Sequence, residues 1–236
     1  MKYLIVTITT FLLLGCNAVA VKEDQLVVTQ TGEKYYQLND KNFDRFVVKS
    51  RNEFTHYSKL HIQPVETEGM RILTSRDNDI DRSWIDVSTE DLQAYTNGFA
   101  ELAKITFDNS ETHTLSSQAG AGTLNVQFKL LEFRPYANRH GVAATKTAVD
   151  EAVKSFGELK YQAVLTDSLS GEIVAIAEDG ISLDTRHQGL TYTGVGVGID
   201  SRARNTLPNQ RAAWRRAMKA WLTDLKEDLN DLSANT

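Results

Sequence analysis

The side chains able to do metal or nucleophilic chemistry are few and scattered along this chain. Glu53 and His56 stand three residues apart, where they could share a helical face, and His61 follows closely. A structural metal site needs about four ligands in a fixed geometry, and no fourth ligand accompanies these three. The other histidines are isolated from one another: His113, His140 and His187. We therefore expect ordinary surface histidines, with no metal and no other cofactor.

No nucleophile stands in a recognisable catalytic setting. The chain has neither the Gly-x-Ser-x-Gly elbow of hydrolases nor a Ser-x-x-Lys motif. The glycine-rich stretch 194–198 has the wrong spacing for a dinucleotide fingerprint, which also needs a helix directly after it. A flexible loop or a tight strand turn, with an edge free to bind a partner, is the favoured interpretation. The sequence thus predicts a protein that is not an enzyme, and a cell-wall hydrolase is the weakest alternative.

Basic residues precede acidic residues along the last predicted helix. No Asp or Glu lies between Ser201 and Thr223, whereas Arg and Lys recur there. Four of these cations form a candidate site for an anion or a partner: Arg211, Arg215, Arg216 and Lys219. The acids that follow are Asp224, Glu227, Asp228 and Asp231. This order opposes the helix dipole, which favours acids early and bases late. The cations either pair with acids of the same domain or bind a lipid head group, peptidoglycan carboxylates or an acidic protein surface.

The N-terminus has the three parts of an export signal. Lys2 is positively charged, the run 3–14 is uncharged but shorter than a membrane span, and the small residue Gly15 precedes Cys16. Cys16 is the only cysteine, and an unpaired thiol in an exported protein calls for an explanation. The sequence therefore predicts signal cleavage between Gly15 and Cys16. An uncleaved anchor helix with an incidental cysteine is the alternative.

The residues Leu13-Leu14-Gly15-Cys16 resemble the lipobox of bacterial lipoproteins. That resemblance implies that Cys16 carries two or three acyl chains, palmitate among them. Because each buried methylene contributes about 0.8 kcal/mol, several chains together give an almost permanent membrane anchor. Asn17, by resemblance to enterobacterial lipoproteins, implies export to the outer membrane, with the domain facing the periplasm.

Length and composition place the chain among ordinary globular proteins. Of its 236 residues, 41% are hydrophobic and 24% are charged, and the formal net charge is −5. An acidic balance argues against nucleic acid as a partner. We expect a signal peptide over 1–15, a lipidated N-terminus and tether over 16–50, and a single domain over 51–236. Within the tether, 26–28 or 43–48 could instead add an edge strand.

Apolar periodicity predicts the elements of an α+β domain. Spacings of three and four residues indicate two main helices, over 88–107 and 209–232. Ser88 or Thr89 can cap the first, and Ser50 with Glu53 matches a capping box for a short helical turn. A weaker helical pattern covers 143–156. Alternation predicts strands over 60–63, 70–73, 123–133, 157–165 and 173–177, with a polar loop over 76–82. The expected fold is an antiparallel or mixed sheet of about four to five strands with two main helices packed on it.

Several soft features accompany the lipobox: Tyr57-Ser58-Lys59-Leu60, Leu165-Thr166-Asp167-Ser168-Leu169-Ser170-Gly171-Glu172, and a final helix with Trp214 and Trp221. On these features the chain resembles an uncharacterised family of bacterial lipoproteins, domain of unknown function 3313. More distantly, its element order is similar to the N-terminal domain of the Tol-Pal translocation protein and to lipoproteins that activate penicillin-binding proteins. Fold alone leaves function open.

The leading hypothesis is a non-enzymatic, membrane-anchored periplasmic domain that binds an envelope protein by a sheet edge or by the final helix. A binder of anionic envelope lipid or peptidoglycan, acting through the basic residues, is the alternative.

Overall fold

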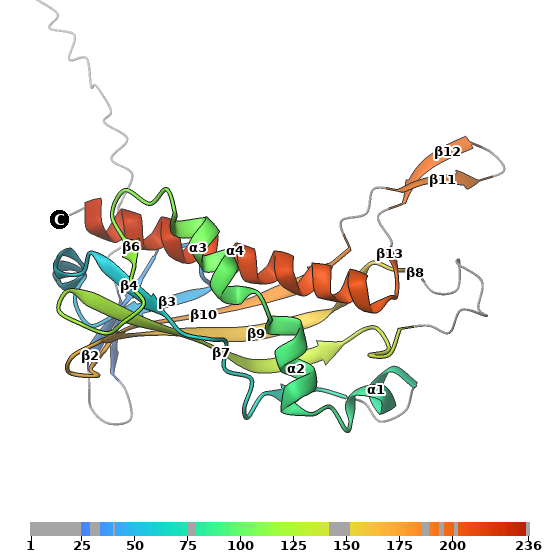
Figure 1. Cartoon of the computed structure of the whole chain (residues 1–236), viewed down its shortest axis with the longest axis horizontal. Coiled ribbons are helices and arrows are strands. Elements are labelled where there is room, and N and C mark those ends of the chain that lie inside the picture. Colours follow the sequence, from blue (N-terminus) through green and yellow to red (C-terminus); the bar gives the residue numbers. More distant parts are fainter. Residues whose placement is uncertain are drawn as a thin grey trace, which may run out of the picture.

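The structure is a computed structural model that describes residues 25–28, 34–39, 41–74, 79–141, 152–185, 189–193, 196–200 and 203–234. It is an α+β fold in which the last helix runs along one face of a mixed sheet (Figure 1). The strands are β1 (Gln25–Val28), β2 (Lys34–Leu38), β3 (Arg45–Val48), β4 (Lys59–Ile62), β5 (Arg71–Ile72), β6 (Thr114–Leu115), β7 (Thr123–Pro135), β8 (Ala152–Val153), β9 (Ser155–Asp167), β10 (Ile173–Asp184), β11 (Gly189–Thr193), β12 (Gly196–Asp200) and β13 (Ala203–Arg204). The helices are η1 (Arg51–His56), α1 (Asp79–Trp84), α2 (Thr89–Thr96), α3 (Phe99–Phe107) and α4 (Leu207–Ala234).

The main sheet has nine strands, in the order β1-β2-β3-β10-β9-β7-β4-β6, with β5 also beside β7. The prediction of four to five strands is therefore wrong. The strands that sequence reasoning missed or left open are two to five residues long, too short to show a period of two. Separate two-stranded pairs, β11 with β12 and β8 with β13, lie outside this sheet.

The segment 25–48 belongs to the sheet. Strand β3 pairs antiparallel with β10, β2 pairs with β3, and β1 pairs with β2. Phe46 and Val48 are fully buried in the main core. Strands β1, β2 and β3 therefore lie within the range expected to be a tether, and both segments for which an edge strand was the alternative, 26–28 and 43–48, lie in or beside these strands.

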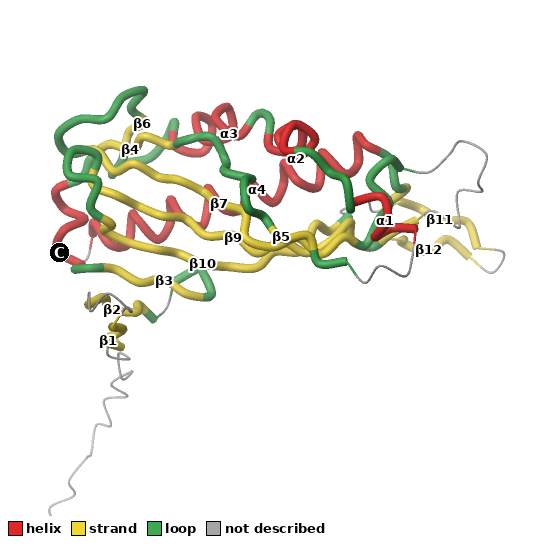
Figure 2. Tube along the Cα trace, turned by 90° about the horizontal axis from the view of Figure 1, so that it is seen from below, coloured by secondary structure: helices red, strands yellow, loops and turns green. Residues whose placement is uncertain are grey.

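The long strands β7, β9 and β10 form the centre of the sheet, and the predicted hairpin of β9 and β10 is confirmed. Its turn is held by Asp167, whose Oδ1 accepts the N–H groups of Leu169 and Ser170 at 3.0 and 2.7 Å. Alternation, interrupted in β7 by a register shift between Leu130 and Glu132, puts one set of side chains into the core and the other onto the opposite face. In the described part of the chain, no helix covers β7, β9 and β10 on that opposite face (Figure 2).

The opposite face of the sheet carries a ladder of paired polar side chains next to an apolar row of Val47, Ile176 and Val164. Arg45 forms an ion pair with Glu178 at 3.0 Å, and Gln162 donates to the same carboxylate at 2.8 Å. Lys129, opposite Gln162 in the register, forms an ion pair with Glu66 at 3.1 Å. The polar groups of this ladder can remain in contact with water, so this part of the face needs no covering layer.

The final helix packs on the sheet with the predicted stripe. Its buried members include Trp214, Ala217, Met218, Trp221, Leu225 and Leu229, none more than 3% exposed. Trp221 stacks on Tyr161 of β9 with ring centroids 4.4 Å apart, and Trp214 meets Phe133 of β7 edge-on at 5.5 Å. Aromatic contacts of this geometry add to the free energy of apolar burial. The stripe therefore joins α4 to the middle of the sheet.

The predicted helix over 88–107 is two helices. Gly98, with φ +88°, separates α2 from α3, because this left-handed conformation ends one helix before the next begins. Ser88 caps α2 in a capping box with Asp91, as predicted. The other predicted box does not form, since Ser50 makes no side-chain cap hydrogen bond to η1. Within the described residues no helix is long and apolar enough to cross a membrane.

Two other predicted segments differ in part. The loop expected over 76–82 contains the start of α1. Of the helical pattern over 143–156, residues 142–151 lie outside the described part, and the rest contributes to β8 and β9. In the glycine-rich stretch, positions 194–195 lie outside it as well, and Gly196 to Gly198 belong to β12, paired with β11.

Candidate functional site

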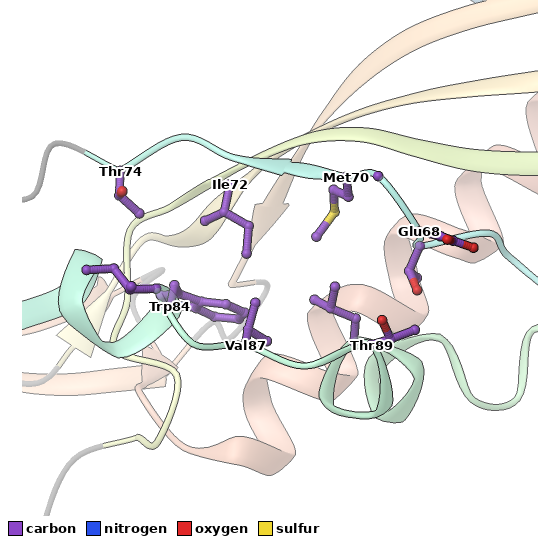
Figure 3. Close-up of a pocket in the computed structure, with 11 residues that line it drawn as sticks. Glu68, Met70, Ile72, Thr74, Trp84, Val87 and Thr89 are labelled. Carbon is purple, nitrogen blue, oxygen red and sulfur yellow. The ribbon is translucent and has the colours of Figure 1, made fainter.

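A hollow of about 680 Å³ lies between β5 and the segment that joins α1 to α2 (Figure 3). We call it the β5 hollow. Its described lining is Thr67, Glu68, Gly69, Met70, Ile72, Thr74, Trp84, Ile85, Val87, Thr89 and Leu92. Six of these are large apolar residues, and Glu68 is the one charged residue among them. Such a composition suits apolar groups oriented by a few polar contacts.

The two walls of the β5 hollow come from different elements. Met70 and Ile72 are two residues apart, so their side chains leave the chain on the same side. Figure 3 shows both pointing across the space toward Trp84, Val87 and Thr89. Strand β5 is held in place by parallel pairing with β7, Ile72 opposite Phe133.

The floor of the β5 hollow is fixed by Trp84. The side chain is 2% exposed, and its Nε1–H donates to the carbonyl oxygen of Ala137 at 2.8 Å. Its ring also meets Phe133 edge-on, with centroids 4.8 Å apart. The indole is thus held from two directions, and the hollow is formed without a ligand.

Strand β5 has a free edge beside the hollow. Leu73 donates its N–H to Phe133 of β7 at 2.8 Å, so the backbone groups of Arg71 and Leu73 face β7. Successive residues of a strand point their backbone groups to opposite edges, so Ile72 presents its N–H and C=O on the other side. Among the described residues, no strand pairs with β5 there. Ile72 therefore combines an apolar side chain that lines the hollow with backbone N–H and C=O groups that a further strand could pair with.

A second hollow, of about 320 Å³, lies between α2 and α4. We call it the basic hollow. Its described lining is Ala94, Tyr95, Asn97, Arg211, Ala212 and Arg215. Tyr95 is buried, and its hydroxyl donates a hydrogen bond to the side-chain oxygen of Gln210 at 2.8 Å. Burial raises the pKa of Tyr95 to about 12. Both arginines are exposed at the rim.

The structure divides the four cations that the sequence grouped together. Arg211 and Arg215 line the basic hollow, and Lys219 follows one turn later on the same exposed face. Arg216 points elsewhere, because its Nη2 donates to the carbonyl oxygen of Asp184 at 2.8 Å. Arg215 has one acidic neighbour, Glu101, at 3.6 Å. For Arg211 and Lys219, the part of the chain that is described contains no ion-pair partner.

The acids in the C-terminal half of α4 meet the loop between β2 and β3. Asp228, 3% exposed, accepts the backbone N–H of Asn42 at 3.1 Å, and Asp231 pairs with Lys41. Burial raises the pKa of Asp228 to about 6, against the opposing effects of Asn42 and Lys41. Burial and nearby Asp179 raise the pKa of Asp224 to about 6 as well. These acids are therefore mostly contacts within the fold.

The histidines do not converge. His56 and His140 are exposed, and His61 Nδ1 lies 3.1 Å from the carbonyl oxygen of Ser116. His113 is 1% exposed, and burial lowers its pKa to about 4. His187 lies outside the described residues. Within those that are described, no three His, Cys, Asp or Glu residues are placed to share a metal ion.

Sequence reasoning did not find the β5 hollow. The alternation of Met70 and Ile72 gave the strand, but the facing wall follows a segment expected to be a polar loop. No sequence periodicity relates Trp84, Val87 and Leu92 to the residues of β5, because only the tertiary fold brings the two walls together. Gly15 and Cys16, the proposed cleavage and acylation sites, lie outside the described residues.

Comparison with known proteins gives neither a family-model match nor a match among curated proteins. The resemblances to domain of unknown function 3313, the Tol-Pal protein and the penicillin-binding-protein activators are therefore not supported. Several solved structures can be aligned with this chain, with low sequence identity and low TM-scores. A Xanthomonas campestris protein of the domain of unknown function 330 family has 12% identity over 77% of this chain and 89% of its own, with a TM-score of 0.40.

Two further structures are similar at the same level. A "putative lipoprotein" from Caulobacter crescentus has 10% identity over 79% of this chain and 100% of its own, with a TM-score of 0.36. PelC from Paraburkholderia phytofirmans, solved as a dodecamer, has 11% identity over 72% and 87%, with a TM-score of 0.32. TM-scores of this size do not place the chain in any of these families.

Proposed function

We propose that this protein is a lipid-anchored protein of the bacterial cell envelope that binds a partner protein and catalyses no reaction. The β5 hollow is the observation that carries the binding function. The anchor is proposed from Leu13-Leu14-Gly15-Cys16, and placement in the outer membrane from Asn17.

The proposed partner is an extended protein segment with apolar side chains at alternate positions. Such a segment can continue the sheet by pairing with the free backbone groups of Ile72, as in strand addition. Its inward side chains would then meet Met70, Val87 and Trp84 in the hollow. A fatty acyl chain could use the apolar lining but not the backbone edge. The combination of edge and hollow therefore favours a peptide.

The binding mode is tested by crosslinking inside cells. A photo-crosslinking residue at Ile85, 57% exposed on the rim of the β5 hollow, should capture one dominant envelope protein. The same residue at Leu169, 71% exposed on the distant β9–β10 turn, is the matched control. Met70→Gln with Val87→Thr should reduce capture at position 85 at least about tenfold, because polar groups would be buried without partners.

Mass spectrometry should map the crosslink to one extended segment of the captured protein. Equal capture at 85 and 169, or capture unaffected by the Met70 and Val87 changes, would show that the hollow is not the binding site. Product release from purified cell-wall sacculi by the wild-type protein would contradict the non-enzymatic part of the proposal.

The anchor is tested by Cys16→Ala. The variant should carry no acyl mass and keep its signal peptide, because the acceptor thiol is gone. If it still fractionates as a processed membrane protein, the anchor is wrong. Density-gradient separation of inner and outer membranes checks the Asn17 expectation independently.

A further inference from the structure

We infer that the basic hollow binds the phosphate of an anionic phospholipid head group, so that the N-terminal half of α4 lies against the membrane. The inference rests on the proposed lipid anchor, which keeps the domain beside a bilayer. It assigns a second contact, separate from the β5 hollow.

Two arginine side chains line one small space. Arg211 and Arg215 are one helical turn apart, and both line the hollow. A guanidinium group donates a planar fork of hydrogen bonds that matches a phosphate or a carboxylate. Asn97, from the end of α2, adds a side-chain amide to the lining. The described lining contains no acid.

The backbone beside the hollow leaves room for Arg215. Gly98, directly after Asn97, has no side chain, and a Cβ built there would lie 3.0 Å from Arg215 Nη1. The guanidinium therefore lies close over the junction of α2 and α3. Its one acidic neighbour, Glu101, is 3.6 Å away, and both side chains are about half exposed or more. Such a pair contributes little, so a phosphate can compete for the arginine.

The distribution of charge favours one part of the domain for contact with an anionic membrane. The chain as a whole carries a formal net charge of −5, which an anionic bilayer repels. Along α4, Arg211 and Lys219 are cations of the N-terminal half that have no ion-pair partner among the described residues, whereas Glu227 and Asp231 are exposed in the other half. Within this helix, attraction to an anionic membrane is therefore strongest beside the basic hollow.

The anchor makes a lipid the nearest source of phosphate. Eight residues, 17–24, separate Cys16 from β1. A fully extended chain rises at most about 3.6 Å per residue, so this stretch reaches roughly 30 Å. The domain thus stays near the head groups, and the hollow meets lipid phosphates at high local concentration.

The test uses the lipidated protein in vesicles. Ala100, exposed two residues after Gly98, is replaced by cysteine and labelled with a fluorophore, while acylation blocks Cys16. Quenching by a head-group quencher should be strong in phosphatidylglycerol vesicles and weak in phosphatidylcholine vesicles. Arg211→Gln with Arg215→Gln should lower the docked-to-undocked ratio about twenty-five-fold, since each arginine near an anionic surface contributes about a factor of five.

The matched control is Lys34→Gln with Lys59→Gln, which removes two exposed charges on β2 and β4 and should change the ratio no more than about twofold. Equal quenching in both vesicles, or equal loss in both double variants, overturns the inference. A response to inorganic phosphate in neutral detergent, without a preference for phosphatidylglycerol, would show a site for free phosphate and reject the lipid. A response to peptidoglycan fragments alone would reject it too.

The two proposals can fail separately. If the purified protein has no acyl mass, the anchor is wrong, while pelleting of that protein with phosphatidylglycerol vesicles still tests the arginines. If the acyl mass is present and the arginine change has no effect, the anchor stands and the head-group site is wrong.

Discussion

The backbone N–H of Asn42 donates to the Asp228 carboxylate at 3.1 Å, joining the loop before β3 to the C-terminal half of α4. This contact helps to explain why acidic residues are tolerated at the C-terminal end of α4. Acids late in a helix oppose its dipole, and here Asn42 and Lys41 lie against them. The remaining cost is electrostatic. Burial partly removes the Asp224 and Asp228 carboxylates from water, and other acids lie close to both.

The first prediction concerns Asp228 and pH. Its folded pKa of about 6 lies above the ordinary aspartate pKa of 3.8, so the folded state binds more protons between these values. The carboxylate therefore destabilises the fold fully above pH 6, and stability is regained as pH falls through 6 toward 4. Asp228→Asn keeps an acceptor for Asn42 and removes this gain, so its unfolding free energy at pH 5, relative to pH 8, should be about 1–2 kcal/mol less favourable than in wild type.

Urea unfolding at the two pH values measures this difference. Asp86→Asn, a change at an exposed acid, is the control and should leave it within about 0.5 kcal/mol of wild type. An unchanged difference in Asp228→Asn would mean that this carboxylate is not the destabilising group.

The second prediction concerns His113 and has the opposite sign. Burial lowers its pKa to about 4 from 6.5, so the unfolded state binds more protons between these values. Its contribution to stability is complete above pH 6.5 and is lost as pH falls to 4. His113→Gln should retain roughly 2 kcal/mol more of its own neutral-pH stability at pH 4.5 than wild type does. His56→Gln, at an exposed histidine, should show the wild-type loss.

The third prediction concerns two glycines of β9 and its turn. A Cβ at Gly157 would lie 2.4 Å from the ring of Phe133 and 2.6 Å from the carbonyl oxygen of Arg134. Gly157→Ala should therefore lower the unfolding free energy by about 4 kcal/mol, through overpacking and backbone strain. At Gly171, φ is +73° but nothing lies within 4 Å, so alanine should cost only about 1–2 kcal/mol. Chemical denaturation of both variants compares them, and equal losses would show that the close approach at Gly157 does not matter.

The fourth prediction compares two buried tryptophans. Trp84 donates its Nε1–H to Ala137, whereas the Nε1–H of Trp221 is buried without an acceptor among the described residues. Replacement by phenylalanine removes similar volume at both sites but breaks a hydrogen bond only at Trp84. Trp84→Phe should cost about 1–3 kcal/mol more than Trp221→Phe in thermal or urea unfolding. A larger loss at Trp221 would contradict the assigned partners.

Local pattern by itself determined the long elements. The alternation in β7, β9 and β10 and the apolar stripe of α4 come from side chains that share one face of one element, and a periodic sequence records this directly. The same is true of the Ser88 cap and of the spacing that puts Arg211, Arg215 and Lys219 in one row. The resemblance to a lipobox likewise rests on four consecutive residues, 13–16, and needs no knowledge of the fold.

Tertiary structure decided the rest, because it depends on contacts between segments far apart in sequence. Short strands such as β5 form through pairing with β7, and two residues carry no period of their own. The direction of the Arg216 side chain follows from how α4 packs on β10, which brings the carbonyl oxygen of Asp184 within reach. The β5 hollow exists only where Ile72 faces Val87 across the fold, and no spacing along the chain encodes that meeting.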